Sequence, residues 1–597
     1  MAASDPQGWR ERAEGLRREG RLEEAVHAGR RAVEQAPGDP RAWSELAHAL
    51  RLGGKLGEAK AAAARAVELG PGLASAWFNL GAVLLAQGDA AQSIEANRKA
   101  LALDPGLAEA WSNLGGALAA SGDSMGEIDA YRRALDINPR LAAVWSNLGN
   151  ALREARRTAE AVAACRRAVE IDPGFAAAWC NLANAQLESG EPEKALRSSE
   201  SALRLERGLA EAWSALGGAL LALRRYVEAA RAHEEAVRLR PGSANLHFNL
   251  GMTLRHGGRS ADAIAHFRRA IEIEPDHADA HCDLSLALLF TGQLREGWEE
   301  FEWRWRRPEA EARRYDFTTW DGDASRPRRL LLWGEQGVGD EVLHGSMLAD
   351  LVASSVAITL EVDPRLAPLY QRSFPRLAVI PRRAPPAASA ATHDCQAPLG
   401  SLGRWLRSSF DSFPRRRAFL VPDPSRVDEY RNRLAAGHTT VVGISWRSAN
   451  REFGSLKSTE LGDWLEILKQ PRVRFVDLQY GDTASEREML ERRAGLRIEH
   501  LAGLDLIGDI DGLAALCTAC DLVITISNVT AHLAGAVGCP VWLIAPKGNG
   551  RHWYWFSGRG DSPWYPSMRI FDQVTQGNWR PTLDAVAREL AAFVKGR

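Results

Sequence analysis

The chain has 597 residues, too many for a single hydrophobic core, so we expect about two to four domains. Its 75 Lys and Arg residues nearly balance 76 Asp and Glu residues, and a net charge of −1 excludes a large global field that attracts nucleic acid. The first residues lack the apolar run of a secretory signal, and no run of about 18 apolar residues predicts a membrane span. Seven scattered cysteines indicate reduced thiols and a cytoplasmic location.

The first half of the chain repeats with a fixed period of 34 residues. An aromatic residue or a histidine marks each unit, at Trp9, Trp43, Trp77, Trp111, Trp145, Trp179, Trp213, His247 and His281. Proline ends each unit, except where Arg207 stands in its place. This period is typical of helix–turn–helix units stacked along a line, which commonly hold another macromolecule. The half resembles the tetratricopeptide repeat family, which implies an α-solenoid.

The repeat pattern fades after His281. Gly297 and Arg304 replace expected alanines, so we expect a capping helix that completes a superhelix over residues 1–308. The segment Trp298–Trp305 is rich in Trp, Arg and Glu, and we expect it to dock the solenoid on the next domain. The polar residues 309–328 are predicted to be a linker.

Short apolar runs that alternate with helical stretches predict parallel sheets after the linker. The predicted strands are Leu330–Trp333, Ala357–Glu361, Ala378–Pro381, Thr440–Trp446, Arg474–Gln479, Asp521–Ile526 and Val541–Ile544. We divide this region into a lobe at 329–425 and a lobe at 426–597, and we interpret Pro381–Ser389 as a loop. Two doubly wound lobes place a ligand cleft between their strand carboxyl ends.

A glycine-rich segment, Gly334–Glu341, follows the first predicted strand. Gly337 and Gly339 allow a sharp turn and a close approach to a ligand, and Asp340 and Glu341 would stand at the cleft mouth. Asp340 has two interpretations. It is either a catalytic base or an acidic partner of a helix N-terminus, worth under about 1 kcal/mol.

The first strand of the second lobe leads into a polar loop that carries Arg447 and Lys457. These cations are either phosphate ligands through charge-assisted hydrogen bonds or isolated surface charges. The buried strand at 521–526 leads into Ser527, Asn528 and Thr530, which suit a helix N-terminus that binds an anion. His532 in the same turn is a ligand contact or a satisfied core histidine.

Two short motifs resemble metal sites. Cys517 and Cys520 form the one close cysteine pair, in an apolar helical stretch without a second pair, so we favour core packing over metal or redox work. Asp321 and Asp323 lie in the linker before any strand, and we interpret their spacing as coincidental. We therefore predict no metal and no cofactor other than the donor substrate.

The C-terminal part resembles the ADP-heptose–lipopolysaccharide heptosyltransferase family through three segments. These are Gly339–His344, the loop lysine Lys457, and His532 with the small residues Ala534–Ala536. The resemblance implies the two-lobed GT-B architecture, Asp340 as the base for the acceptor, and Lys457 on donor phosphate. The family has an aspartate five residues before the histidine, where this chain has Ser527, so an anionic sugar becomes easier to accept.

Repeats followed by such a transferase resemble O-GlcNAc transferase in layout. The segments Gly334–Glu341, Pro398–Leu402 and Ser527–His532 are similar to those of bacterial tetratricopeptide transferases that attach nonulosonic acids, carried on CMP, to flagellin. This resemblance implies a nucleotide-sugar donor and flagellin as the acceptor protein.

Asparagine recurs two residues after the marker position, at Asn79, Asn113, Asn147, Asn181 and Asn249. At about 100° per residue this position points away from the packed seam. An Asn amide can bind a peptide backbone without reading its sequence, so these residues are predicted to line an acceptor groove. Recent duplication that simply copied Asn is the alternative.

The sequence thus predicts an inverting, metal-independent protein O-glycosyltransferase that modifies Ser or Thr of a protein held by the repeats. Two alternatives stay open. One is an adaptor without catalysis, for which Ser527 argues, and the other is a heptosyltransferase-like enzyme that acts on a lipid-linked glycan.

Overall fold

The computed structural model describes residues 6–307, 315, 317–323, 329–352, 356–383, 392–435, 439–450 and 453–596. Most of the predicted linker and of the loop Pro381–Ser389 lies outside these residues. The chain forms two compact units, Met1–Arg240 and Pro241–Arg597. The last repeat helices therefore group with the α/β lobes rather than with the preceding repeats.

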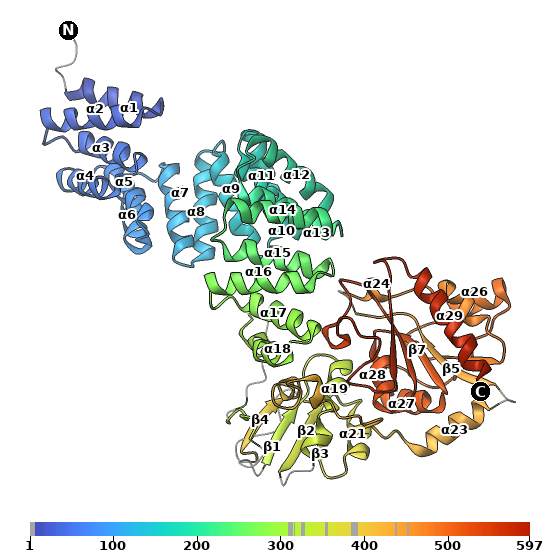
Figure 1. The fold of residues 1–597 in the computed structure, drawn as a ribbon. Helices are drawn as coiled ribbons and strands as arrows, with labels where there is room; N and C mark the ends of the chain where they lie inside the picture. Colours follow the sequence, from blue (N-terminus) through green and yellow to red (C-terminus); the bar gives the residue numbers. More distant parts are fainter. Residues whose placement is uncertain are drawn as a thin grey trace. The chain divides into compact units, whose positions relative to one another are not determined.

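The first unit is a stack of antiparallel helix pairs, each pair one sequence repeat long (Figure 1). Its helices are α1 (Pro6–Arg18), α2 (Leu22–Gln35), α3 (Pro40–Leu52), α4 (Leu56–Leu69), α5 (Ala74–Ala86), α6 (Ala90–Leu103), α7 (Ala108–Ala120), α8 (Ser124–Ile137), α9 (Ala142–Glu154), α10 (Thr158–Ile171), α11 (Ala176–Glu188), α12 (Pro192–Leu205), α13 (Ala210–Ala222) and α14 (Tyr226–Leu239). The predicted α-solenoid is confirmed.

The marker tryptophan makes the same hydrogen bond in six successive repeats, from Trp43 to Trp213. The Trp145 indole Nε1 donates to the Pro139 carbonyl, six residues earlier, at 2.9 Å, and five other tryptophans repeat this contact. Trp213 uses the carbonyl of Arg207, because the acceptor is backbone and needs no proline. His247 and His281 keep a ring nitrogen near the equivalent carbonyl, at 3.1 and 2.9 Å, which explains why histidine can share this position with tryptophan.

A small residue in the first helix of each repeat faces a matching residue in the second. A Cβ at Gly115 would lie 2.6 Å from the Tyr131 ring, and one at Gly251 would lie 2.7 Å from the Phe267 ring. Ala183 faces the small residue Ser199 at the same offset of 16 positions, and both are buried. The glycines therefore admit a large partner at close helix spacing.

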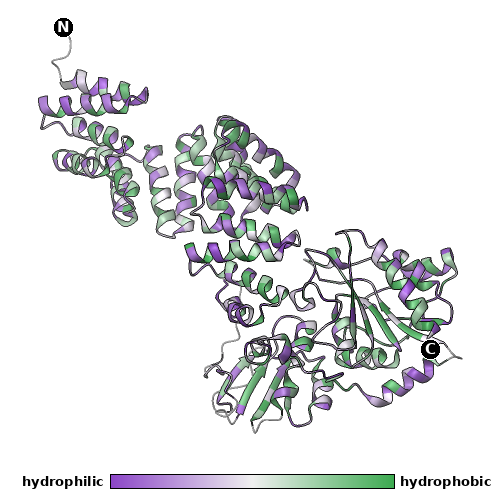
Figure 2. Cartoon of the chain, viewed as in Figure 1, coloured by the Kyte–Doolittle hydropathy of each residue, from purple (hydrophilic) through white to green (hydrophobic). Residues whose placement is uncertain are grey.

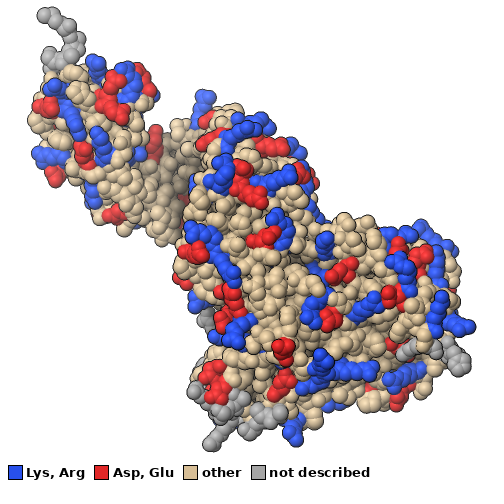
Figure 3. Space-filling view, viewed as in Figure 1, with Lys and Arg blue, Asp and Glu red and all other residues tan. Residues whose placement is uncertain are grey.

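Charges of both signs are interspersed over the face of the repeats seen in Figure 3. Several form ion pairs between neighbouring repeats, such as Arg30–Glu58 at 2.6 Å and Arg132–Glu160 at 2.9 Å. Because these pairs are largely exposed, each stabilises the stack by at most about 1 kcal/mol.

The second unit begins with α15 (Ala244–His256), α16 (Ser260–Ile273), α17 (Ala278–Thr291), α18 (Leu294–Phe301) and η1 (Glu302–Arg306). The predicted docking by Trp298–Trp305 is confirmed. The Trp298 ring is buried and its Nε1 donates to the Arg407 carbonyl at 3.0 Å, while Arg304 donates to both carboxylate oxygens of Glu335. Arg304 also reaches the Ser401 hydroxyl, so the segments around 335 and 401 hold the helical cap.

Two fully parallel sheets follow, ordered β3-β2-β1-β4 and β6-β5-β7-β8-β9. Their strands are β1 (Arg329–Trp333), β2 (Ala357–Val362), β3 (Ala378–Pro381), β4 (Cys395–Pro398), β5 (Thr440–Ser445), β6 (Val473–Asp477), β7 (Leu522–Ile526), β8 (Val541–Ala545) and β9 (Met568–Asp572). The seven predicted strands are present, and the sequence analysis missed β4 and β9. In β4, a run of only four residues that ends in proline is too short to show a period.

Helices flank both sheets, and Figure 2 colours much of the central strands green, as hydrophobic. They are α19 (Val338–Gly345), α20 (Leu348–Leu351), α21 (Ala367–Ser373), η2 (Leu399–Leu402), α22 (Gly403–Leu406), η3 (Phe410–Ser412), α23 (Pro424–Leu434), α24 (Gly454–Lys457), η4 (Leu461–Trp464), α25 (Leu465–Leu468), α26 (Ala484–Ala494), α27 (Ile510–Ala519), α28 (Val529–Ala536), η5 (Trp553–Trp555) and α29 (Arg580–Lys595). None of the helices in the described ranges has the length and apolar character required to cross a membrane.

Part of the predicted linker belongs to the first sheet. Trp320 donates its backbone N–H to the Gln396 carbonyl at 2.8 Å, and Thr319 forms a parallel bridge with Gln396. The Trp320 side chain is buried among residues of the first lobe. A linker was predicted here because the residues around Trp320 are polar, and a single anchoring tryptophan forms no local pattern.

The two lobes and the cap share one hydrophobic core, which includes Trp298, Leu343, Ala534 and Trp555. Helices α19 and α28, which follow the first strand of one lobe and the buried strand of the other, pack against each other. This contact brings the two predicted strand-to-helix turns together.

Candidate functional site

Asp340 lies in the first turn of α19, directly after the glycine-rich segment. Its carboxylate accepts the Gly337 backbone N–H at 3.2 Å, so the helix-partner interpretation is correct as far as it goes. The residue stays partly exposed. Burial, with a smaller contribution from Glu335, raises the pKa of Asp340 to about 6, while the Gly337 N–H and Lys457 oppose the shift. A carboxylate with this pKa is suited to proton transfer near neutral pH.

Glu341 was expected at the acceptor side of the cleft, and this prediction is wrong. The side chain is 1% exposed, forms an ion pair with Arg382, and accepts the Asp363 N–H at 2.9 Å. A Cβ at Gly334 would lie 2.4 Å from the Glu341 carboxyl group, so glycine there makes room for it. Neighbouring residues in the first turn of a helix point in different directions, and here Asp340 keeps solvent contact while Glu341 is buried.

Lys457 comes from the other lobe, in the one-turn helix α24 where a polar loop was predicted. The residue is 4% exposed, and burial lowers the pKa of its ammonium group to about 8, while Asp340 opposes that shift. Asp340 and Lys457, which come from different lobes, lie close enough for each to affect the pKa of the other.

His552 is a member of this site that the sequence analysis missed. Lys457 Nζ lies 2.9 Å from His552 Nε2. Burial, together with Lys457, lowers the pKa of His552 to about 3, so the ring is neutral and accepts a hydrogen bond from the Lys457 ammonium group. The ring stacks on Tyr554 at a centroid distance of 5.1 Å. The aromatic run at 552–556 was the available signal, in a chain with only 7% aromatic residues.

The turn between β7 and α28 is held by its own side chains. Asn528 accepts the Thr530 N–H at 3.0 Å as an N-cap and donates to the Ser445 hydroxyl at 2.7 Å, which ties β7 to β5. The Ser527 hydroxyl is buried and accepts the Trp555 indole N–H at 2.8 Å. Thr530 is fully buried, and its hydroxyl has no hydrogen-bond partner among the described residues.

His532 lies at the contact between α19 and α28. It is buried, its Nδ1 lies 3.0 Å from the Tyr565 hydroxyl, and its ring stacks on Trp555. A Cβ at Gly339 would meet the His532 ring at 3.1 Å, so the predicted close approach at Gly339 is to this histidine. Burial, followed by nearby His552 and Lys457, lowers the pKa of His532 well below its usual value. The satisfied-core interpretation is therefore confirmed.

Arg447 stands at the end of β5 with its guanidinium already engaged. It lies 3.3 Å from Glu486 and donates to the Asp482 carbonyl at 3.0 Å. The side chain is 36% exposed, so a ligand can still reach it. The polar partners of the Arg447 guanidinium are thus Glu486 and Asp482 rather than Asp340 or Lys457.

The asparagine ladder is only partly accessible. Asn79 is 5% exposed and donates to the Ser44 hydroxyl of the preceding repeat at 2.8 Å, so its prediction as a groove residue is wrong. Asn181 makes the equivalent bond to Ser146 at 2.9 Å. Asn147 is exposed, and Asn113, Asn181 and Asn249 are half-buried. The prediction considered one helix alone, but the first helix of the neighbouring repeat covers this face near Asn79.

The two short motifs that resemble metal sites, the cysteine pair and the linker aspartates, have ordinary structural surroundings. Cys517 and Cys520 are buried in the shared core, as expected, and burial raises the pKa of both thiols well above the usual range. Asp321 accepts the Asp323 N–H at 3.1 Å in an exposed turn. Across the described part of the chain, no group of three or more His, Cys, Asp and Glu side chains could hold a metal ion.

Comparison with known proteins identifies the repeats. Tetratricopeptide repeat models match residues 6–49, 44–108, 128–174, 152–218, 228–278 and 248–294. Protein FlbA of Caulobacter vibrioides is 36% identical over 332 residues, which cover 51% of this chain and 54% of FlbA. The chain thus spans about half the length of this curated relative.

Solved structures resemble the helical part at low identity. The Cut9–Hcn1 hetero-tetramer of APC/C matches with 20% identity and a TM-score of 0.39, over 45% of this chain and 52% of that one. Pseudomonas aeruginosa pilF matches with 23% identity and a TM-score of 0.31, over 35% and 94%. A thermophilic TPR protein of Thermus thermophilus matches with 21% identity and a TM-score of 0.29, over 30% and 99%. The family models alone place tetratricopeptide repeats throughout the N-terminal half, and two parallel sheets follow it.

Proposed function

We propose that this chain is an inverting protein O-glycosyltransferase of the GT-B architecture. The repeats hold an acceptor protein, flagellin in the first instance, and the cleft between the lobes holds a nucleotide-activated sugar, a CMP-linked nonulosonic acid in the first instance. The observation that carries the proposal is the hydrogen-bond contact of Lys457 with the neutral ring of His552 in one lobe, within electrostatic reach of Asp340 in the other.

The two residues have complementary tasks in this reaction. The acceptor hydroxyl oxygen attacks the anomeric carbon, its proton passes to Asp340, and the sugar–phosphate C–O bond breaks with its electron pair on the phosphate oxygen. General-base catalysis of this kind contributes about 10²–10⁴ in rate. Lys457, supported by Arg447 and the N-terminus of α28, stabilises the negative charge on the departing phosphate.

The decisive experiment is Asp340→Asn. The amide can still accept the Gly337 N–H but cannot take a proton, so transfer to the acceptor protein should fall about 10²–10⁴-fold while donor binding is retained. Asp321→Asn is the matched control, because that aspartate lies in an exposed turn outside the site. Full transfer activity in Asp340→Asn would refute the assignment of the base.

A second candidate is a repeat adaptor without catalysis. It is favoured by Ser527, which stands where the heptosyltransferases have an aspartate and whose hydroxyl is bound by Trp555. An adaptor binds the acceptor protein and transfers nothing from any donor. A panel of CMP-, UDP-, GDP- and ADP-sugars, assayed by intact-mass measurement of the acceptor, separates the two candidates.

A further inference from the structure

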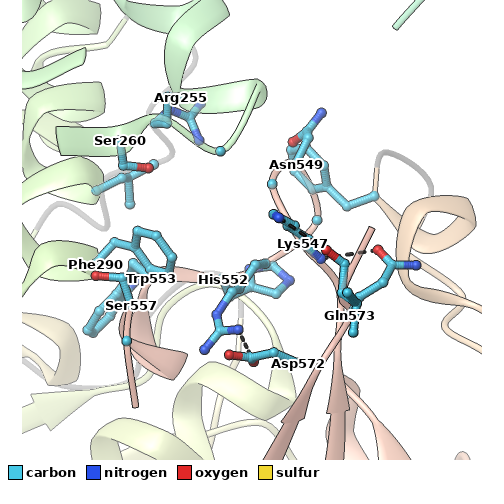
Figure 4. A pocket seen from close by; sticks show the side chains of 18 residues that line it. Arg255, Ser260, Phe290, Lys547, Asn549, His552, Trp553, Ser557, Asp572 and Gln573 are labelled. Carbon is cyan, nitrogen blue, oxygen red and sulfur yellow. Dashed lines mark hydrogen bonds and ion pairs between the residues drawn. The ribbon is translucent and has the colours of Figure 1, made fainter. Parts of the chain in front are cut away.

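A cavity of about 560 Å³ lies beside the Asp340–Lys457 site. It is lined by Lys547 and His552 from the segment after β8 and by Asp572 at the end of β9, and the repeat helices α15–α17 contribute Arg255, Ser260 and Phe290. Figure 4 shows the repeat residues facing the lobe residues across this cavity. Segments beyond the carboxyl ends of parallel strands are where open α/β sheets bind ligands.

The charges that line the cavity are predominantly positive. Three cations line it, Arg255, Lys547 and Arg551, against one carboxylate, Asp572. Arg551 is ion-paired with Asp572, and Arg255 is ion-paired with Asp283 at 2.8 Å, which leaves Lys547 as the cation available to a ligand. Lys547 donates to the Val574 carbonyl at 3.1 Å, and no carboxylate of the described chain pairs with it. An ammonium group with two remaining donors can therefore bind an anion.

The rest of the lining suits a small molecule with an apolar face. Phe290, Phe453 and Trp553 present aromatic rings. Gly548 and Gly550, which also line the cavity, adopt φ values of +69° and +98°, a backbone conformation that favours glycine. The volume fits a nucleotide or an acidic nine-carbon sugar and is within the ordinary range of small-molecule sites.

The cavity also reaches a direct neighbour of Lys457. His552 lines it and at the same time lies 2.9 Å from Lys457 Nζ. A ligand in the cavity therefore lies one side chain away from Lys457. This proximity favours a substrate moiety over a remote effector.

We propose that this cavity binds the anionic moiety of the donor, and that the last repeats, through Arg255, Ser260 and Phe290, complete the small-molecule site. The shared chemistry is a small organic anion, whether a nucleoside phosphate or a sugar carboxylate. The identification of the ligand as a donor rests on the proposed function. The consequence is that the repeats do more than present the acceptor, because they also form one wall of the donor site.

The test uses the full chain and two substitutions at one position, one that adds a negative charge and one that does not. Ser260 is the first residue of α16, where an acidic side chain suits the helix N-terminus, so Ser260→Asp should fold. Ser260→Asn has the same size without the charge. Isothermal titration with CMP, with N-acetylneuraminic acid and with inorganic phosphate should show binding weakened about tenfold in Ser260→Asp and much less in Ser260→Asn. Neutral N-acetylmannosamine should not bind.

Lys547 provides a second, independent arm. Lys547→Gln should weaken anion binding about tenfold, Lys547→Arg should largely restore it, and Lys469→Gln, a surface lysine paired with Glu466, should change nothing. Binding of CMP and phosphate indicates a phosphate subsite, and binding of N-acetylneuraminic acid without phosphate indicates a carboxylate subsite. Either result supports the proposal.

The proposal is overturned if none of the anions binds the wild-type chain, or if Ser260→Asp and Lys547→Gln bind them as the wild type does. Normal transfer in both variants would overturn it while leaving the proposed function intact. Anion binding that follows the variants, without transfer to any acceptor protein, would instead refute the proposed function and leave the cavity as an anion site.

Discussion

The repeats and the α/β lobes use their residues in opposite ways. In the repeats, one contact recurs, such as the bond from Trp145 to the Pro139 carbonyl, and its copies are spread along the chain. In the lobes, each contact occurs once, as between Lys457 and His552, which lie 95 residues apart. A repeated contact becomes visible as a period in the sequence, whereas a single contact between distant residues becomes visible only in the folded chain.

The largest effect that tests this difference is expected at the single lobe site. Lys457→Gln removes the cation that, in the proposed reaction, faces the departing phosphate, and we expect sugar transfer to fall about 10²–10³-fold. Single-turnover transfer to the acceptor protein measures it, with Lys469→Gln as the matched surface control. Transfer within a few-fold of wild type would mean that other groups replace the positive charge of Lys457, so that the lobe site would be as redundant as the repeated contacts.

A substitution inside one repeat should have a smaller and local effect. Gly115→Ala places a Cβ 2.6 Å from the Tyr131 ring, and we expect a loss of about 1–3 kcal/mol in the free energy of unfolding, despite the better helix propensity of alanine. Urea unfolding followed by far-ultraviolet circular dichroism measures it. Gly116→Ala is the control, since its nearest contact is the flexible end of Leu85 at 3.3 Å.

The same clash offers a rescue. Adding Tyr131→Ser to Gly115→Ala copies the small pair that Ala183 and Ser199 form in another repeat. A midpoint for the double variant no higher than that of Gly115→Ala would show that the match across the two helices is not what the glycine provides.

The pH dependence of transfer tests the paired site without mutation. Burial raises the pKa of Asp340 to about 6, so the base is protonated at lower pH and the rate should rise about tenfold per pH unit up to that value. Burial lowers the pKa of Lys457 to about 8, so the cation is lost at higher pH and the rate should fall beyond it. A bell-shaped profile between these values is expected, and a flat profile from pH 5 to 6 would exclude Asp340 as the titrating base. In Asp340→Asn the acidic limb should disappear from any residual activity.

The smallest effect is expected for one copy of the repeated hydrogen bond. Trp145→Phe removes the indole donor to the Pro139 carbonyl and should lower stability by about 1 kcal/mol. Trp145→His should lose less of the bond, because His247 keeps a ring nitrogen 3.1 Å from the Pro241 carbonyl. Equal losses in thermal unfolding for both variants would mean that ring volume, not the donor, explains the period.

What could be predicted from the sequence also differs between repeated patterns and contacts that occur only once. The helices were predictable because a period of 34 residues repeats their packing, and the central strands because buried parallel strands are continuous apolar runs. Strand β4 and the anchor Trp320 were missed, since neither has a local pattern. Within the site, Asp340 and Lys457 were identified from their positions after strands, but the buried state of Glu341 and the partnership of His552 depend on side chains far away in the chain.

The cysteines offer a practical handle on this molecule. All seven are buried, and burial raises the pKa of Cys282 and Cys395 to about 11, which keeps their thiols protonated and slow to react with maleimides. A cysteine engineered at Val227, which is 69% exposed on α14, would therefore be the preferred attachment point for a fluorophore. Such a label on the native background would report acceptor capture by the repeats without prior removal of natural thiols.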